Sequence, residues 1–258
     1  MDAYKESFQR YEKKFLISEE QYQSILQYLK TIASPDQYGL TTIHNIYYDT
    51  ENWYLVRKSI EGPVYKEKLR LRTYEKPKGS SPSFIEIKKK YRDIVYKRRI
   101  SLPYDEAVSY LGTMKREKFQ DYSSEQIGRE IDSFLKFHEN IMPKMDIFYD
   151  RIAWAGISDP EFRVTFDSNI RYRTDDLDLK NGSGGKSLLN ADEKLMEIKI
   201  KRAVSLPLAR ALSKAGIKMC SFSKYGSSFK ELNRIESTEQ RREMTWTTYS
   251  PQLSRTAP

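Results

Sequence analysis

Alternating apolar and charged residues mark several segments of the chain as strands with two unlike faces. Glu-Ile-Lys occurs at 86–88 and again at 197–199, each time led in by two apolar residues. Alternate side chains of a strand point to opposite faces, so glutamate and lysine share one face and isoleucine takes the other. Residues 68–72, 97–100 and 163–167 repeat this alternation. We therefore predict strands with one apolar face and one charged, mostly basic face.

The same pattern divides the chain into a strand, a helix, several strands, two helices, further strands and a last helix. The predicted strands span residues 15–17, 42–48, 65–74, 84–90, 94–102, 145–155, 162–173 and 194–202. Proline and glycine at 76–83 and 156–160 mark turns between neighbouring strands. Alternation of this kind is typical of an antiparallel sheet.

Apolar residues at helical spacing predict the helices. The predicted helices follow Ser18, cover residues 104–111, surround residues 127–135 and run from Pro207 to about residue 215. Ser18 and Gln21 have the spacing of a capping box, in which each side chain binds the other's backbone N–H. His138 continues the apolar stripe of the third helix, so we interpret it as a packed helix residue rather than a ligand.

We assign residues 1–235 to one domain and residues 236–258 to a polar tail. The tail shows no periodicity, so we expect it to be partly disordered or to lie along the surface. No segment approaches the roughly 20 consecutive apolar residues that span a bilayer. Residues 1–10 lack a signal-peptide core, and Cys220 alone cannot form an internal disulfide. We therefore expect a soluble, cytoplasmic protein.

The basic strand faces have two explanations. An antiparallel sheet with one solvated face gives the same alternation. Solvated faces usually mix uncharged polar residues with both signs of charge, whereas these faces are crowded with arginine and lysine and carry a glutamate at two matched places. The chain has 45 Lys and Arg against 36 Asp and Glu, a net charge of +9. Such an excess favours polyanionic partners: phosphorylated molecules, polyphosphate, nucleic acid or an acidic membrane surface.

Several familiar functional motifs do not fit. Gly-Lys-Ser at 185–187 lacks the earlier glycine of a phosphate-binding loop, because Lys180 stands there. His44 and His138 are too few for a Cys/His zinc site, and they do not support a serine nucleophile. The 19 tyrosines show no sheet motif of the RNA-recognition type, so we expect no nucleic-acid partner.

Eight short segments stand out in order along the chain. They are Arg-Tyr-Glu-Lys-Lys-Phe at 10–15, Ile-Tyr-Tyr-Asp at 46–49, Leu-Arg-Leu-Arg at 69–72, Phe-Ile-Glu-Ile-Lys at 84–88, Lys-Arg-Arg at 97–99, Arg-Val-Thr-Phe-Asp at 163–167, Met-Glu-Ile-Lys at 196–199 and Phe-Ser-Lys-Tyr at 222–225. Together they resemble the VTC domain, the polyphosphate polymerase domain of the triphosphate tunnel metalloenzyme or CYTH-like superfamily. The resemblance runs from about Glu6 to Leu232. It implies an α+β fold: an eight-stranded antiparallel β-tunnel with helices packed outside and a basic interior.

The resemblance also implies which residues act on a phosphate chain. The implied phosphate-binding residues are Arg10, Lys14, Arg70, Arg72, Lys88, Arg151, Arg163, Lys199, Ser223 and Lys224. Lys97 and Arg99 share a strand face and should join them, whereas Arg98 should point away. The residues expected to be catalytic are Arg70, Arg72, Lys88, Arg151, Arg163 and Lys224.

Carboxylates belong to the same implied site. Glu197 is similar to the residue that holds a divalent metal, Mn²⁺ or Mg²⁺. Glu86 matches a second carboxylate that orients basic neighbours, with a second metal position as the alternative. Triphosphatase and adenylate cyclase relatives carry Glu-x-Glu-x-Lys where this chain has Arg10, Glu12 and Lys14. The arginine removes a metal ligand, as in polymerase relatives, whereas Glu12 departs from the fungal polymerases and keeps a hydrolytic role open.

The resemblance implies an enzyme that transfers the terminal phosphate of ATP to a polyphosphate chain with the help of the metal. One alternative is a metal-dependent triphosphatase acting on tripolyphosphate or nucleoside triphosphates. Another is a non-catalytic polyphosphate or nucleotide sensor. Eukaryotic relatives add SPX and membrane domains that are not found here, so we expect any membrane association to come through a separate membrane-protein partner. The oligomeric state is not set by the sequence.

Overall fold

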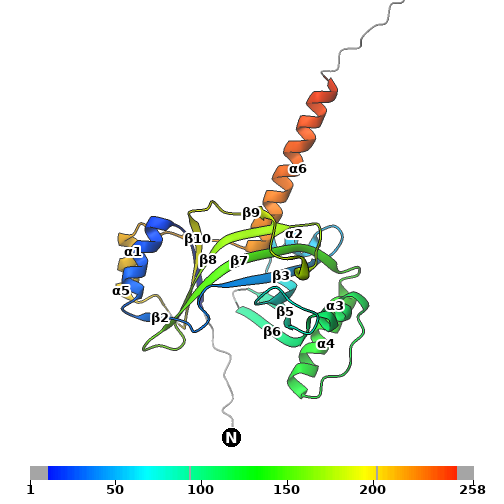
Figure 1. Cartoon of the computed structure of the whole chain (residues 1–258), viewed down its shortest axis with the longest axis horizontal. Coiled ribbons are helices and arrows are strands. Elements are labelled where there is room, and N and C mark those ends of the chain that lie inside the picture. The colour runs from blue at the N-terminus through cyan, green and yellow to red at the C-terminus, as the bar shows by residue number, and fades with distance from the viewer. Residues whose placement is uncertain (1–10, 93, 202, 249–258) are drawn as a thin grey trace, which may run out of the picture.

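Eight long strands form one continuous antiparallel sheet (Figure 1). The computed structural model describes residues 11–92, 94–201 and 203–248. The long strands are β1 (Tyr11–Ser18), β3 (Thr41–Asp49), β4 (Tyr65–Thr73), β5 (Pro82–Tyr91), β6 (Ile94–Pro103), β7 (Met142–Gly156), β8 (Arg163–Arg173) and β10 (Glu193–Ile200). They follow one another in the order β1-β10-β8-β7-β3-β4-β5-β6. The α+β class with a large antiparallel sheet is therefore confirmed.

The strand prediction is confirmed for the long strands and wrong in the total number of strands. Each predicted strand overlaps one of the long strands. The sheet has 11 strands rather than eight, because three short strands also pair with it. These are β2 (Ala33–Pro35), β9 (Lys186–Ser187) and β11 (Met219–Cys220). Elements of two or three residues are too short to show an alternating pattern.

Six helices and one 3₁₀ turn accompany the sheet in the described part of the chain. They are α1 (Glu19–Leu29), α2 (Tyr54–Ile60), α3 (Tyr104–Thr113), α4 (Tyr122–Phe137), η1 (Leu179–Asn181), α5 (Leu206–Lys214) and α6 (Lys224–Thr248). The predicted capping box is present at α1, where Ser18 Oγ accepts a hydrogen bond from Gln21 N at 3.2 Å. Neither α2 nor α6 was predicted. No helix among the described residues has the length and apolar character needed to cross a membrane.

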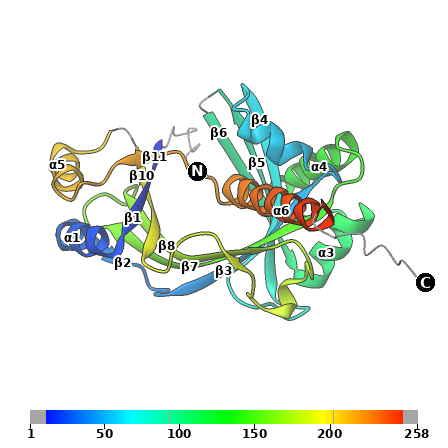
Figure 2. The ribbon, with the colours of Figure 1, turned by 90° about the horizontal axis from the view of Figure 1, so that it is seen from above.

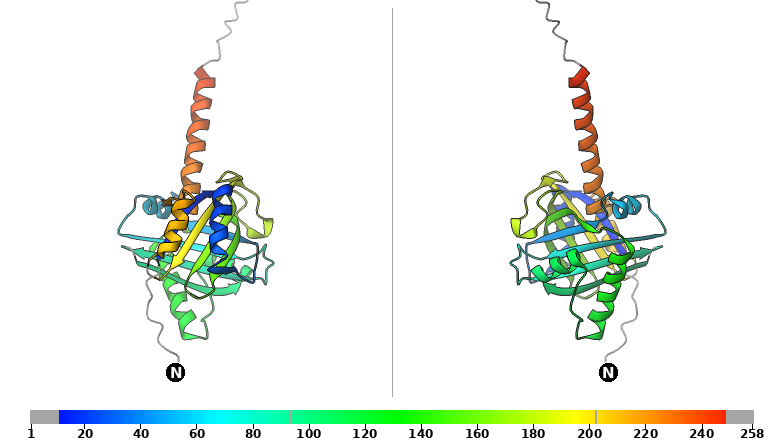
Figure 3. Two further views of the ribbon diagram at one scale, coloured as in Figure 1. Left: turned by 90° about the vertical axis from the view of Figure 1, so that its left-hand side faces the viewer. Right: turned by 90° about the vertical axis from the view of Figure 1, so that its right-hand side faces the viewer.

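Residues 236–248, which were assigned to the polar tail, belong to a helix. Helix α6 continues through Glu236 to Thr248, and Figure 3 shows it projecting from the body of the domain. A helix that projects in this way needs no apolar stripe, so its polar sequence gives no helical periodicity. Residues 249–258 lie outside the described part of the chain, and the domain boundary near residue 235 stays a prediction.

Two apolar clusters cover the outer face of the sheet, as the alternation predicted. One cluster joins β4 and β5 to α3 and α4, with members including Leu69, Leu71, Ile85, Ile87, Tyr110 and Phe134. The other joins β1, β8 and β10 to α1 and α5, with members including Phe15, Ile25, Val164, Ile198 and Leu208. Figure 2 shows these helix pairs outside opposite arms of a strongly curved sheet.

A third apolar cluster lies on the inner face of the sheet, where two further helices pack. It joins strand residues to α2 and α6, with members including Ile43, Tyr47, Val56, Met145, Ile147, Tyr225 and Phe229. Ile43 and Tyr47 share strand parity with Asn45, which contacts inner-face arginine Arg72. Apolar side chains at inner positions must be covered, and α2 and α6 cover them. The inner face therefore has an apolar part under these helices and a charged part beside them.

The curvature brings the two arms of the sheet into electrostatic contact. Burial and Glu197 would raise the pKa of Glu12 on β1, but lysines that include Lys88 on β5 hold it below its usual value. Lys68 on β4 donates to Ser223 Oγ, just before α6, at 3.0 Å. The two edge strands of the sheet are β6 and the short strand β11, and they are not paired with each other among the described residues. Charged side chains of both arms thus converge within the curve.

Candidate functional site

Strand register places the predicted basic residues together on the inner face. Arg70 is paired in register with Glu86, and Glu86 with Arg99. Arg98 lies between Lys97 and Arg99 on β6 and so has the opposite direction. It points outward as predicted, and its Nε lies 3.4 Å from Glu130 of α4. The two faces of these strands therefore differ as the alternation required, with charge inside and apolar packing outside.

Glu86 is the centre of the first charged cluster. It is buried, with 1% of its surface exposed. Arg70 Nη2 lies 2.6 Å from Glu86 Oε2, Lys97 Nζ lies 2.7 Å from Oε1, and Arg72 Nη1 lies 3.7 Å from Oε2. Burial alone would raise the pKa of Glu86, but these three cations hold it well below its usual value. The contacts favour the role of orienting basic residues over that of holding a second metal.

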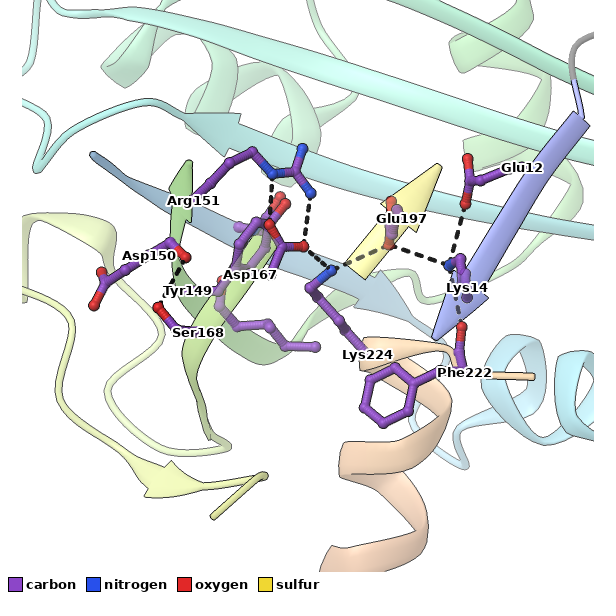
Figure 4. Close-up of polar contacts among 12 residues, drawn as sticks. Glu12, Lys14, Tyr149, Asp150, Arg151, Asp167, Ser168, Glu197, Phe222 and Lys224 are labelled. Carbon is purple, nitrogen blue, oxygen red and sulfur yellow. Dashed lines mark hydrogen bonds and ion pairs between the residues drawn. The ribbon is translucent and has the colours of Figure 1, made fainter. Parts of the chain in front are cut away.

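Glu197 is the centre of the second charged cluster (Figure 4). Lys14 Nζ lies 3.3 Å and Lys224 Nζ 3.4 Å from Glu197 Oε1. Lys224 also binds Asp167, which accepts two hydrogen bonds from Arg151 at 2.6 and 2.7 Å. Burial would raise the pKa of Glu197, yet Lys224, Lys14 and Arg151 hold it well below its usual value. The cluster stays charged at neutral pH.

Tyr149 lies between the two clusters, and the pKa of its phenol depends on whether the surrounding electrostatic potential is positive or negative. Arg72 Nη2 donates to Tyr149 Oη at 3.2 Å, while Arg151 and Lys224 lie 5.1 and 4.4 Å from its ring centroid. Burial would raise the pKa of this phenol, but the three cations lower it to about 8. A buried phenol ionises this readily only where the potential is positive. The surroundings of Tyr149 on the inner face are therefore electropositive despite the nearby Asp167.

Three lysines of the inner face form no ion pair with any described residue: Lys68, Lys88 and Lys199. Burial lowers the pKa of Lys68 to about 7, and Lys88, Lys66 and Lys14 add to the effect. Burial also lowers the pKa values of Lys88 and Lys199. Burial of a cation that has no direct ion pair is unfavourable, so a bound anion would stabilise all three.

The first turn of α6 brings Ser223 and Lys224 to the same place. Ser223 Oγ accepts from Gly226 N at 3.2 Å, which makes Ser223 the N-cap of the helix, and it also accepts from Lys68. Lys14 Nζ donates to Phe222 O at 3.1 Å. The helix start is thus tied to both arms of the sheet.

Asp49 fixes the position of α6. Its buried carboxylate accepts from Leu55 N at 2.8 Å, Val56 N at 2.9 Å and Tyr225 Oη at 2.8 Å. Tyr225 stacks on Tyr47 with ring centroids 4.4 Å apart, and the Tyr47 hydroxyl accepts from inner-face Arg70. Asp49 therefore connects the start of α2, the first turn of α6 and the charged inner face.

Asp49→Asn is expected to destabilise the protein by about 2–3 kcal/mol, because its amide nitrogen would face N–H donors that now bind a carboxylate oxygen. Urea unfolding followed by circular dichroism measures the loss. Asp192→Asn, at an exposed position, is the control and should change stability by less than about 0.5 kcal/mol. Equal stability of the two variants would contradict the role assigned to Asp49.

The remaining predicted site residues lie at the margin or outside the described chain. The Arg99 guanidinium lies 4.7 Å from the Phe84 ring centroid, and the ion pairs of Glu86 are with Arg70, Arg72 and Lys97 instead. Arg163 is half exposed at the start of β8 and pairs with Asp36 at 3.1 Å. Arg10 lies outside the described residues.

Inner-face residues that contact the predicted site but were not predicted include Asn45, Tyr47, Lys68, Tyr149 and Asp167. The parity rule already contained the signal for two of them, since Lys68 shares a face with Arg70, and Asp167 with Arg163. Asn45 and Tyr149 share their strand faces with apolar residues. The pattern did not show that these faces point inward, because the inner cluster under α2 and α6 was not predicted.

Glu12 and Glu197 could supply part of the ligands of a divalent metal. Lys14 Nζ lies 3.2 Å from Glu12 Oε1 and 3.3 Å from Glu197 Oε1, so these two carboxylates converge. Carboxylate oxygens suit Mg²⁺ and Mn²⁺. Among the described residues no group of three or more His, Cys, Asp and Glu side chains could hold a metal ion. Phosphate oxygens and water would have to complete the coordination, as Mg²⁺ commonly requires.

The sequence profile of the VTC domain matches residues 9–233. The chain belongs to the VTC domain family. This family is the one that the eight segments indicated, so the predicted membership is confirmed. A search of curated proteins found no match.

Solved structures share the fold at low sequence identity. A proposed adenylyl cyclase from Hippeastrum, described as having a dominant triphosphatase activity, is 13% identical with a TM-score of 0.50 over 84% of this chain and 93% of that protein. A proposed adenylate cyclase from Vibrio parahaemolyticus is 14% identical with a TM-score of 0.49 over 86% and 98%. The Hippeastrum protein thus shares the overall fold of this chain.

Proposed function

We propose that this VTC domain transfers the terminal phosphate of ATP to a polyphosphate chain. The observation that supports the proposal best is the electropositive inner face, where lysines without ion pairs stand beside guanidinium groups fixed by buried carboxylates. Phosphoryl transfer requires mainly positioning and charge neutralisation. Arginine and lysine held in this way supply both, and family membership supports a substrate that carries several phosphates.

The proposed roles follow from how each cation is held. Arg70, Arg72 and Arg151 present rigid, pre-oriented forks that suit phosphate oxygens in bidentate fashion. Lys88 and Lys224 supply point charges from opposite arms, and Arg163 receives substrate at the margin. The additional phosphate-binding residues proposed are Arg10, Lys14, Lys97, Arg99, Lys199 and Ser223.

Glu197 is the proposed metal ligand, with Glu12 beside it. A bound Mn²⁺ or Mg²⁺ would supply charge stabilisation to the transferring phosphoryl group. Lys14 and Lys224 contact Glu197 and would also be available to phosphate oxygens if Glu197 held a metal. The chain's own cations then neutralise the remaining phosphate charge.

A metal-dependent triphosphatase is the second candidate, and Glu12 favours it. Glu12 lies 3.2 Å from the lysine that also contacts Glu197, so a second carboxylate would be available beside Glu197 to help hold a metal or to accept a proton from an attacking water. The Hippeastrum relative, described as having a dominant triphosphatase activity, is a precedent for this reaction on the same fold.

Incubation of the purified protein with ATP and Mn²⁺, followed by gel electrophoresis of the products, separates the candidates. A ladder of polyphosphate is expected for the proposed polymerase. Free phosphate without a ladder would replace it with the triphosphatase. Intact ATP together with a raised melting temperature would show binding without turnover, as in a sensor, and would overturn both enzyme proposals.

Anion binding is expected to weaken as the pH rises from 6 to 9. Burial lowers the pKa of Lys68 to about 7 and that of Lys97 to about 8. Both lysines are charged below these pKa values and neutral above them. A bound anion favours the charged form and raises both pKa values, so the lysines take up protons when the anion binds near pH 8. Sulfate is a suitable probe because its own charge is constant over this range.

Calorimetric titration with sulfate in two buffers of different ionisation enthalpy measures this proton uptake. Lys68→Met should reduce it, whereas Lys89→Met, on the outer face of β5 beside Glu130, should leave it unchanged. Sulfate affinity that is equal at pH 6 and pH 9 would contradict the assignment of these lysines to anion binding.

A further inference from the structure

Exposed apolar and aromatic side chains lie together at one end of β4, β5 and β6. This group, here called the tip patch, has members that are each between 38% and 62% exposed: Val64, Tyr65, Tyr91, Ile94, Val95 and Tyr96. Tyr65 is paired in register with Tyr91, and Tyr91 with Ile94, so these three residues form one row across three strands. Val64 lies beside the row, because its backbone oxygen accepts a hydrogen bond from Arg92 N at 2.6 Å. A contiguous exposed group of this kind marks an interaction surface, whereas single exposed apolar residues do not.

The tip patch extends beyond the packed part of the domain. Ile87 is the last buried residue of β5, and Tyr91 ends the strand four residues later. Each residue of a strand advances about 3.3 Å, so the strand end lies about 13 Å beyond Ile87. Figure 2 shows this end of β4, β5 and β6 at the edge of the molecule, away from α1 and α5. Tyr91 and Ile94 belong to the outer face, whereas Val95 has the parity of inner-face Lys97. The apolar side chains therefore surround the strand ends instead of covering one face.

Cations dominate the sequence around the tip patch. Residues 64–66 and 89–98 carry six Lys and Arg against one Asp or Glu, compared with 45 against 36 in the whole chain. Three of the six form ion pairs with carboxylates of β5 and α4: Lys89, Lys97 and Arg98. The Arg92 guanidinium stays at the tip, 5.5 Å from the Tyr91 ring centroid. Even with the carboxylates of β5 and α4 included, positive charge is in excess, which favours an anionic partner over a second copy of this basic chain.

We propose that the tip patch binds directly to the surface of an anionic lipid bilayer. Three of its six members are tyrosines, which are favoured at the interface between membrane and water because the ring is apolar and the hydroxyl polar. Val64, Ile94 and Val95 enter the boundary of the acyl chains, and Arg92 stays with the lipid phosphates.

The shape of the tip fits a bilayer better than a protein partner. Interfacial apolar groups enter a bilayer by about 5–10 Å, so a strand end that extends about 13 Å can enter without the domain core. A protein partner would have to fit side chains that point to both faces of the strands. The contact needs no separate membrane protein, and it does not depend on the reaction at the inner face.

Co-sedimentation of the whole chain with lipid vesicles tests the proposal. The probes are vesicles of phosphatidylcholine alone and vesicles in which about one third of the lipid is phosphatidylserine. The protein should bind the anionic vesicles at least about tenfold more tightly than the neutral ones. This difference should shrink as the salt concentration rises, because salt screens exposed charges.

Substitutions identify the surface that binds. The double variant Tyr91→Ser/Ile94→Ser should bind anionic vesicles about tenfold more weakly, because two apolar side chains are lost from the contact. Arg92→Gln should weaken binding about fivefold, the effect of one basic residue near an anionic membrane. The matched control is Tyr38→Ser/Leu40→Ser, which changes side chains that are 71% and 67% exposed outside the tip patch and should leave binding unchanged.

Melting temperatures without lipid check that the variants fold, and they should stay close to that of the wild type because the substituted side chains are exposed. Equal binding to neutral and anionic vesicles, no binding to either, or equal losses in the two double variants would overturn the proposal. So would a dimer without vesicle binding that dissociates in Tyr91→Ser/Ile94→Ser, because the tip patch would then bind a second copy of the chain.

Discussion

Glu197→Gln is expected to abolish most metal-dependent turnover while strengthening the binding of metal-free tripolyphosphate. The amide keeps the shape of the side chain but loses the charge that attracts a divalent cation. Loss of one electrostatic contribution to the transferring phosphate commonly lowers kcat by about 10²–10³-fold. Metal-free binding should tighten because Lys14 and Lys224 lose a counter-ion at 3.3 and 3.4 Å and become available to the anion.

Initial rates with ATP and Mn²⁺, and calorimetric titration with tripolyphosphate in the presence of a chelator, measure the two effects separately. Glu130→Gln removes a carboxylate from the outer face, where it contacts Arg98, and should leave both unchanged. Weaker metal-free binding with intact turnover would show that Glu197 has a structural role and no role at a metal.

Strand alternation predicted the fold well because the two sheet faces have opposite chemistry over most of their length. In Arg70, Leu71 and Arg72 the inward and outward directions are unambiguous, and the structure places all three as predicted. The rule failed where both faces are apolar. Tyr47 and Ile147 point inward beneath α2 and α6, and only the tertiary packing of those helices shows it.

The candidate site was predictable in composition and less so in its internal contacts. Strand parity and family resemblance together indicated the basic residues that surround Glu86 and Glu197. Neither could show that Asp167 holds both Arg151 and Lys224, because these residues come from three elements that are distant in sequence. Asp49 and Tyr225 belong to segments that carried the resemblance, yet their mutual hydrogen bond depends on how α6 returns to the sheet.

Glu86→Gln is expected to lower stability more than any other single change on the inner face. Glu86 is the counter-ion of Arg70, Arg72 and Lys97 and is 1% exposed. Removing one partner of a buried ion pair costs about 3–5 kcal/mol, because the remaining charge is left uncompensated. For a domain of this size the melting temperature should fall by roughly 10 °C.

The pH dependence and a second substitution identify the cause of that loss. The pKa of Glu86 is held well below the unfolded value of 4.5, so its contribution is present above pH 4.5 and disappears as the pH falls through the folded value. Wild type and Glu86→Gln should therefore differ at pH 7 and converge in acid. Adding Lys97→Gln to Glu86→Gln should recover part of the lost stability, and millimolar tripolyphosphate should raise the melting temperature of the single variant more than that of the wild type. If neither Lys97→Gln nor tripolyphosphate restored stability, lost packing rather than uncompensated positive charge would be the cause of the stability loss. The cations of the inner face would then not need Glu86 as their counter-ion.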